Sequence, residues 1–169
     1  HESTAVQAVD SDAGGFVVRT AGGVVRCDAV VAATNAWTRE LLPAPGRAIE
    51  PQRGQVLATG PVTEAVFDRP VYANHGFEYF RQLPGGSVVL GGWRNLDVQG
   101  ENTSEVALSD TIQANLEAYL RRVHPAFADV EVTHRWAGIM GFSSDGFPLV
   151  GQVPGRAGLF VAAGFTGHG

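Results

Sequence analysis

The sequence predicts an α+β protein, built from part of an α/β domain with a β-meander and from an antiparallel-sheet domain with one amphipathic helix. Three observations lead to this class. Short β-type runs separated by glycine pairs occupy residues 5–34, further strand-like runs occupy residues 55–90, and one long helical pattern covers residues 109–124. With 169 residues, 44% of them hydrophobic and 17% charged, the chain is long and apolar enough to bury a substantial core.

The N-terminal part, residues 1–48, is predicted to belong to the α/β domain. Its strand-like runs are Ala5–Val9, Phe16–Thr20 and Ala29–Ala33, with glycine-containing turns between them. Glycine readily adopts the positive φ of tight hairpin turns, so we expect a β-meander. The third run is apolar on successive residues, as in a strand covered on both faces. Polar Thr34 and Asn35 follow it and are expected to cap a short helix, which Pro43 and Pro45 end.

Residues 49–135 are predicted to form the antiparallel domain. Its expected strands are Gln55–Thr59, Phe77–Arg81, Ser87–Leu90 and Val130–Trp136. The sequence Pro84-Gly85-Gly86 supplies a turn between the second and third strands. From Ser109 to His124, apolar residues recur at helical spacing, and Pro125 stops the helix. The last segment, residues 136–169, is expected to return to the first domain with a short buried strand at Phe160–Ala163.

Composition and motifs argue against several classes of protein. A net charge of −5 and a pI near 5.4 are unfavourable for nucleic-acid binding, and no apolar run reaches the length of about 20 residues that spans a bilayer. No nucleophile elbow, phosphate-binding loop or zinc-protease motif occurs, and the five histidines are scattered, so no metal site is expected. The lone Cys27 is interpreted as a small packed residue, and a reducing, cytoplasmic location is expected.

The two ends of the chain suggest an internal piece of a longer protein. The chain opens at His1 without an initiator methionine and closes within the glycine-rich stretch Gly164–Gly169. A glycine-rich turn normally joins two elements, so we expect truncation at both ends.

Several motifs resemble one known family. Residues 135–169 contain Trp136-Ala137-Gly138, Asp145-Gly146-Phe147-Pro148-Leu149-Val150-Gly151 and a strand that ends in Ala162-Ala163-Gly164. These motifs resemble the C-terminal flavin-contacting part of the D-amino-acid oxidase superfamily, especially its glycine oxidase and sarcosine oxidase branch. Earlier segments resemble other parts of the same family in the same order. Thr4–Val6 resembles its adenine-contacting strand, and Asp28–Trp37 its strand-to-helix cofactor segment. Pro51–Gln55 resembles the start of its substrate domain, and Tyr79–Gly92 its aromatic hairpin.

The resemblance implies FAD as the cofactor. The cofactor-binding residues that it implies are Val6, Thr34, Asn35, Ala36, Trp37, Gly138, Gly164, Phe165, Thr166, Gly167, His168 and Gly169. A strand ending in glycines lets the backbone approach a flat ring, and amides at a helix start favour negative charge. Sarcosine-type members tether flavin through a cysteine at the position of Gly138, so noncovalent FAD is expected here. The alternative interpretation is that these glycines serve only turns.

Substrate-binding residues implied by the resemblance are Tyr79, Arg81 and Met140. Tyr79 lies where the family uses an aromatic residue near the substrate, although a tyrosine that only packs in the sheet is equally compatible. In glycine oxidase, the arginine that binds the substrate carboxylate comes two residues after the Trp-x-Gly triplet, where this chain has Met140. Arg81 or Arg94 could replace it, whereas hairpin arginines are commonly just solvated. No residue is assigned as a catalytic acid or base.

The activity implied for the full-length parent protein is oxidation of the C–N bond of a small-molecule amine or amino acid by hydride transfer to FAD, followed by hydrolysis of the imine. This chain has no G-x-G-x-x-G motif, so we expect it to be inactive by itself. The electron acceptor would be oxygen or another compound. Two alternatives stay open: a flavin dehydrogenase that passes electrons to a partner protein, and a β-rich binding module without a cofactor.

Overall fold

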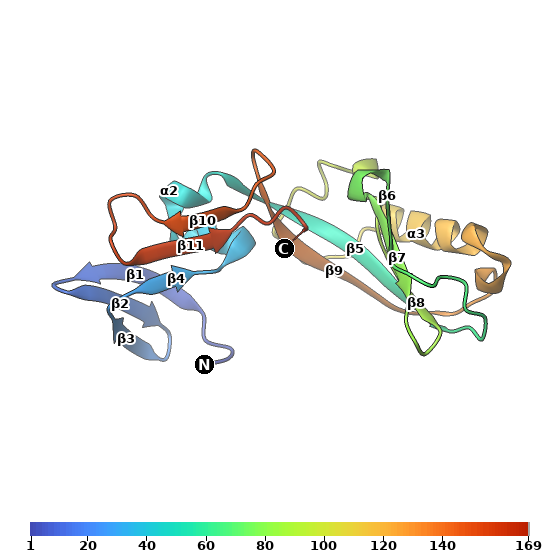
Figure 1. Cartoon of the computed structure of the whole chain (residues 1–169), viewed down its shortest axis with the longest axis horizontal. Helices are drawn as coiled ribbons and strands as arrows, with labels where there is room; N and C mark the ends of the chain where they lie inside the picture. The colour runs from blue at the N-terminus through green and yellow to red at the C-terminus, as the bar shows by residue number, and fades with distance from the viewer. Residues whose placement is uncertain (169) are drawn as a thin grey trace. The chain divides into compact units, whose positions relative to one another are not determined.

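The computed structural model describes residues 1–168 and divides into two compact units (Figure 1). Unit 1 consists of His1–Gln52 and the segment from Met140 onward, and unit 2 of Arg53–Ile139. The sequence places the corresponding boundaries after residues 48 and 135. Unit 1 is therefore assembled from two distant parts of the chain, whereas unit 2 is continuous.

The first sheet of unit 1 is an antiparallel meander. It contains β1 (Val6–Asp12), β2 (Gly15–Thr20) and β3 (Gly23–Cys27), in the order β1-β2-β3. The predicted meander is right in its first two strands and wrong in its third, because Gly23–Cys27 completes it in place of Ala29–Ala33. Val24 and Val25 in β3 are exposed, so this strand lacks the alternation of buried and polar residues that sequence patterns detect.

The second sheet of unit 1 joins the two distant parts of the chain. It contains β4 (Val30–Ala32), β10 (Leu149–Gln152) and β11 (Leu159–Ala163), in the order β10-β11-β4. Strand β11 is antiparallel to β10 and parallel to β4. The predicted strand at Phe160–Ala163 is thus confirmed. Its alternate residues Leu159, Val161 and Ala163 are buried in the core of unit 1.

Three short helical turns follow β4: η1 (Asn35–Trp37), α1 (Thr38–Leu41) and α2 (Pro43–Gly46). The predicted side-chain cap is wrong, since the Thr34 hydroxyl makes no cap hydrogen bond and lies 3.1 Å from the Thr38 hydroxyl. Pro43 ends one turn but also begins the next, as a residue without an N–H can at a first helical position.

Unit 2 is built on a five-stranded sheet of order β6-β7-β8-β5-β9. The strands are β5 (Ile49–Pro61), β6 (Val71–Ala73), β7 (Glu78–Gln82), β8 (Ser87–Gly92) and β9 (Val132–Ser143), with β5 and β9 continuing beyond the unit boundaries. Short turns η2 (Asn74–Gly76), η3 (Arg94–Leu96) and η4 (Pro125–Phe127) connect them. The predicted antiparallel hairpin of β7 and β8 is confirmed.

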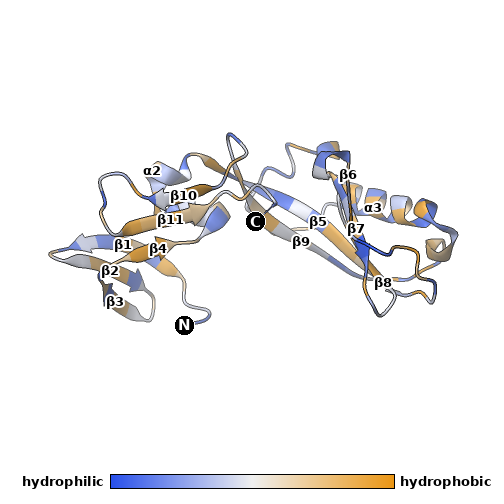
Figure 2. Ribbon diagram, in the orientation of Figure 1, coloured by the Kyte–Doolittle hydropathy of each residue, from blue (hydrophilic) through white to orange (hydrophobic). Residues whose placement is uncertain are grey.

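Helix α3 (Asp110–Val123) covers one face of this sheet (Figure 1). Ser109 caps it by accepting a hydrogen bond from the Ile112 amide, and apolar and polar residues alternate along it (Figure 2). Buried Ile112 and Leu116 belong to the same core cluster as Leu57 of β5 and Leu90 of β8. The amphipathic helix predicted at residues 109–124 is confirmed, and with it the predicted fold class.

A buried ion pair ties the segment after η3 to the sheet of unit 2. Arg53 Nη2 lies 2.7 Å from Glu101 Oε1, and only 1% of the Glu101 side chain is exposed. Gln55 also donates to this carboxylate, and the Arg53 amide donates to the Glu101 carbonyl. Hydrogen bonding to Glu101 raises the pKa of the Arg53 guanidinium.

Candidate functional site

Two of the predicted cofactor segments, residues 34–37 and 164–168, meet in unit 1. Asn35 Oδ1 accepts a hydrogen bond of 3.0 Å from the amide of Gly164, which directly follows β11. A Cβ atom on Gly141 of β9 would lie 2.6 Å from the same oxygen, so only glycine allows this approach. Asn35 and Gly164 have φ values of 42° and 71°, the left-handed region that asparagine and glycine tolerate best. Asn35, Gly141 and Gly164 thereby form a junction within unit 1.

The glycine-rich turn after β11 is fixed by its own hydrogen bonds. The Thr166 amide donates to the Gly141 carbonyl over 2.9 Å, and the His168 amide donates to the Phe165 carbonyl over 3.0 Å. The Thr166 hydroxyl lies 3.1 Å from that of Ser143. Several amides expected to face an anion therefore donate within the protein, and the turn is a rigid surface.

A buried acceptor lies in the same unit. Gln52 Oε1 is the one side-chain nitrogen or oxygen within residues 1–168 recorded as buried and without a hydrogen-bond partner. Gln52 lies three residues after Ile49 in β5, and this odd separation along a strand directs the two side chains to opposite faces. A buried acceptor that is left unsatisfied is unfavourable, so this oxygen fits a ligand that offers an N–H group.

The other predicted cofactor residues differ in accessibility. Val6 begins β1 and is 40% exposed, Trp37 is 42% exposed, and Ala36 is buried. Gly138 is exposed, and a Cβ there would meet no atom within 4 Å. The predicted contact at Gly169 lies outside the described residues.

The predicted substrate residues are divided between the two units. Tyr79 and Arg81 lie in β7 of unit 2, on the sheet face opposite Phe80, which is buried against α3. Met140 belongs to unit 1, where its sulfur would be 3.6 Å from a Cβ on Gly167. The structure therefore brings Met140 to the glycine-rich turn and leaves Tyr79 and Arg81 on the open face of the other unit.

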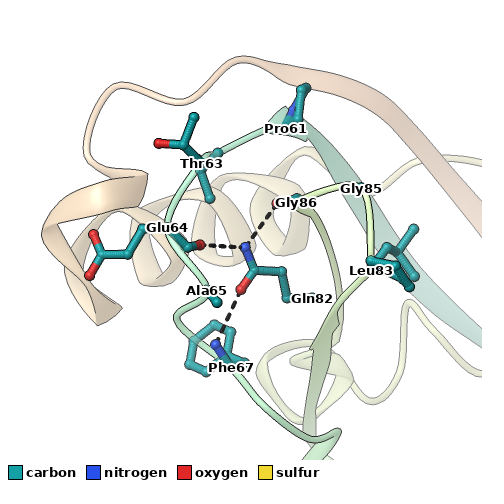
Figure 3. A pocket seen from close by; sticks show the side chains of 11 residues that line it. Pro61, Thr63, Glu64, Ala65, Phe67, Gln82, Leu83, Gly85 and Gly86 are labelled. Atoms are coloured by element: carbon teal, nitrogen blue, oxygen red, sulfur yellow. Dashed lines mark hydrogen bonds between the residues drawn. The ribbon is translucent and has the colours of Figure 1, made fainter.

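A cavity of about 570 Å³ lies at the hairpin end of unit 2 (Figure 3). Gln82 crosses its wall: the side-chain oxygen accepts from the Val66 and Phe67 amides, and the nitrogen donates to the Glu64 and Gly86 carbonyls. The hydrogen bonds of the Gln82 amide therefore hold the loop at residues 64–67 against the hairpin turn at Gly86. We therefore assign the cavity wall a structural role.

Two classes of site are not found in the part of the chain that the structure describes. No group of three or more histidine, cysteine, aspartate or glutamate side chains is arranged to hold a metal ion. No helix there is both long and apolar enough to cross a membrane.

A family model described as FAD dependent oxidoreductase, DAO, matches residues 1–169. The chain belongs to this family. Its FAD-dependent character, predicted from the motifs, is confirmed at the level of the family, and the cofactor-free alternative is not favoured.

Individual relatives support the same placement. The glycine oxidases of Geobacillus kaustophilus and Pseudomonas aeruginosa are each 30% identical over 172 residues, which cover all of this chain and 44% and 45% of theirs. The crystal structure of the Geobacillus enzyme superposes with a TM-score of 0.82 at 28% identity, covering 98% of this chain and 44% of that one. The chain thus spans less than half the length of these relatives.

Some residues of the junction escape prediction from the sequence. Gly141 and Ser143 lie three and five residues after Gly138 of the Trp-x-Gly triplet, and the recurrence of glycine at Gly141 is the one signal that the sequence offers. The unsatisfied oxygen of Gln52 has no sequence signal, because a glutamine in a strand is commonly satisfied by neighbouring strands.

Proposed function

We propose that this protein, with FAD bound noncovalently, oxidises the C–N bond of a small amine or amino acid. The observation that carries the proposal is the junction of Asn35, Gly141 and Gly164, which joins two of the cofactor-type motifs, at residues 34–37 and 164–168, in a chain of an FAD-dependent family. The relatives named as glycine oxidases support an amine substrate.

The residues present fit a flavin. The turn at Gly164–His168 contains two glycines with positive φ, Gly164 and Gly167, which let a flat ring approach the backbone, and unit 1 also contains the buried acceptor Gln52 Oε1. We assign FAD binding to this turn, to Thr34–Trp37 and, for the adenine, to Val6. FAD supplies the two-electron oxidation when bound, and the protein contributes binding, orientation and electrostatics.

Gly138 supports noncovalent attachment, because it offers no side chain for a covalent link. Gly138 is exposed in β9, and the space beside it, where a Cβ would meet no atom within 4 Å, contains no reactive side chain. Acid precipitation of the purified yellow protein should then leave the flavin in the supernatant. Flavin that stays with the pellet would contradict this part of the proposal.

The proposed reaction assigns no protein side chain as a catalytic acid or base, and its electrons and protons balance as follows. The amine loses two electrons and two protons as its C–N single bond becomes an imine. Water then hydrolyses the imine to a carbonyl compound and to ammonia from a primary amine or a smaller amine from a secondary one. Oxygen that accepts the two electrons and two protons becomes hydrogen peroxide. The substrate-facing candidates in this scheme are Tyr79, Arg81 and Met140, which would position the amine.

The test is turnover by the purified full-length protein, loaded with flavin, with a panel of small primary and secondary amines and amino acids. We expect peroxide and carbonyl product in equal amounts. Turnover with an artificial acceptor but without peroxide would identify a dehydrogenase. A yellow, folded protein that oxidises no amine in either assay would refute the proposed function.

A further inference from the structure

Thr166 lies in the middle of the glycine-rich turn and has a backbone conformation that does not suit threonine. Its φ is 55°, between Gly164 at 71° and Gly167 at 79°. Glycine adopts this left-handed region readily, whereas a β-branched side chain there is crowded against the backbone and is an outlier. Such strain persists only where the surroundings enforce it, and it is concentrated at ligand-binding and catalytic sites.

The Thr166 hydroxyl opposes this strain through three contacts. It donates to the Gly164 carbonyl over 3.2 Å, accepts from the Ser143 amide over 3.3 Å, and lies 3.1 Å from the Ser143 hydroxyl. A hydroxyl has one donor and two acceptor positions, so all three are used when the Ser143 hydroxyl donates. The side chain is therefore bonded both to the residue after β11 and to β9.

The backbone of the turn is paired with β9 as well. The Thr166 amide donates to the Gly141 carbonyl over 2.9 Å. Phe165 forms an isolated antiparallel bridge with Phe142 of β9. Gly167 lies close to the same strand, because a Cβ there would be 3.7 Å from Phe142 Cζ. Since Gly167 follows Thr166 directly, a change of φ at Thr166 would displace Gly167 from β9.

The hydrogen bonds of Thr166 extend the junction of Asn35, Gly141 and Gly164. Gly164 donates its amide to Asn35 and accepts the Thr166 hydroxyl at its carbonyl. A continuous set of hydrogen bonds thus runs from η1 through the end of β11 to β9, all within unit 1. Asparagine tolerates a left-handed φ, whereas threonine does not. The conformation of Thr166 therefore depends on its hydrogen bonds.

We propose that Thr166 is a positioning residue for the flavin, whose hydroxyl holds the turn at residues 164–168 in the left-handed conformation that a flat ring can approach. This inference rests on the proposed function, which assigns the flavin to this turn. Thr166 acts through the backbone of its neighbours and needs no contact with the cofactor. Without the hydroxyl, the preference of threonine for negative φ would leave only a fraction of the molecules competent to bind, and the apparent affinity would fall by that fraction.

The experiment separates the hydroxyl from the backbone preference at one position. Thr166→Ser keeps the hydroxyl, Thr166→Val removes it and keeps the β-branched shape, and Thr166→Gly removes it but adopts positive φ without strain. FAD is titrated into the full-length apoprotein, and the quenching of flavin fluorescence gives its dissociation constant. We expect Thr166→Ser to bind FAD as the wild type does, and Thr166→Val about 10- to 100-fold more weakly, because the strained turn relaxes. Thr166→Gly should lie between them.

Hydrogen exchange of the Thr166 amide tests the turn without flavin and so separates this inference from the proposed function. The amide is bonded to Gly141, and its exchange should accelerate in Thr166→Val but less in Thr166→Gly. That pattern supports the inference even if no flavin binds. Ser143→Ala removes one partner of the hydroxyl and leaves residue 166 unchanged, so it should shift both measurements in the same direction by a smaller factor. It decides the matter if Thr166→Val does not fold.

The control is Thr63→Val, the same change at an exposed threonine of unit 2, which should behave as the wild type. Equal effects of Thr166→Val and Thr166→Gly would mean that the hydroxyl acts otherwise than by holding the backbone, and would overturn the inference. Unchanged FAD affinity and unchanged amide exchange in Thr166→Val, or in Ser143→Ala where that variant decides, would overturn it as well.

Discussion

Asn35 offers a direct test of the junction, because one side-chain oxygen joins η1 to the end of β11. In Asn35→Gly, the left-handed φ of 42° is retained without strain, and only the acceptor for the Gly164 amide is lost. Leaving a buried amide unsatisfied lowers the free energy of unfolding by about 1–3 kcal/mol. Asn35→Ala loses the same acceptor and also places a Cβ-bearing residue in the left-handed region, which adds about 1–2 kcal/mol.

The assay is urea unfolding of the three proteins, together with the dissociation constant of FAD. We expect stability to fall in the order wild type, Asn35→Gly, Asn35→Ala, and FAD to bind more weakly in both variants. Asn35→Asp is the matched control, since it keeps an oxygen acceptor and tolerates the same φ. If Asn35→Gly is as stable as the wild type and retains FAD equally well, the hydrogen bond to Gly164 does not hold the junction together.

Three further changes test unit 2. Glu101→Gln leaves the buried Arg53 without its counter-charge and should lower the free energy of unfolding by about 3–5 kcal/mol in urea titrations. Hydrogen bonds from two arginines lower the pKa of the Glu117 carboxyl in the folded protein below its ordinary value of 4.5. The ionised carboxylate therefore stabilises the folded protein above pH 4.5, and this stabilisation is lost as the pH falls through the lowered pKa. In Glu117→Gln, the free energy of unfolding should therefore fall less steeply at acid pH. Gly91→Ala places a methyl group against the Tyr79 ring and should lower the melting temperature.

Each of these changes has a control nearby in the chain. Glu105→Gln removes an exposed carboxylate from the segment that carries Glu101, and unchanged stability of both variants would rule out a stabilising buried pair. Glu131→Gln removes an exposed carboxylate beside β9, and an acid profile identical to that of Glu117→Gln would refute the linkage. Gly85→Ala adds a methyl group where no atom lies within 4 Å; an equal loss in both glycine variants would mean that ring contact is not the cause.

Local patterns predicted most of unit 2. The α3 helix and the β7–β8 hairpin have strong periodicity and clear turn residues, and the structure confirms both. The third strand of the meander was missed because Val24 and Val25 are both exposed, and the pairing of β4 with β11 joins residues too far apart for any local signal. Such contacts depend on the tertiary fold rather than on neighbouring residues.

The candidate site was predicted in its parts but not in its geometry. The motifs placed Asn35 and Gly164 in one cofactor region, while the hydrogen bond between them and the close approach of Gly141 required coordinates. The pairing of Tyr72 with Tyr79, and of Tyr79 with Gly91, depends on the register of three strands, which the sequence leaves undetermined.

The parallel pairing of Val30–Ala32 with Leu159–Val161 has a consequence for biosynthesis. Strand β4 is synthesised before β11. It therefore has no β11 partner while the continuous segment Arg53–Ile139 is translated. That segment contains all the contacts of its own core and can close first, because short loops close at a smaller entropic cost than long ones. Unit 1 is then completed last, because its second sheet needs strand β11, which is synthesised last.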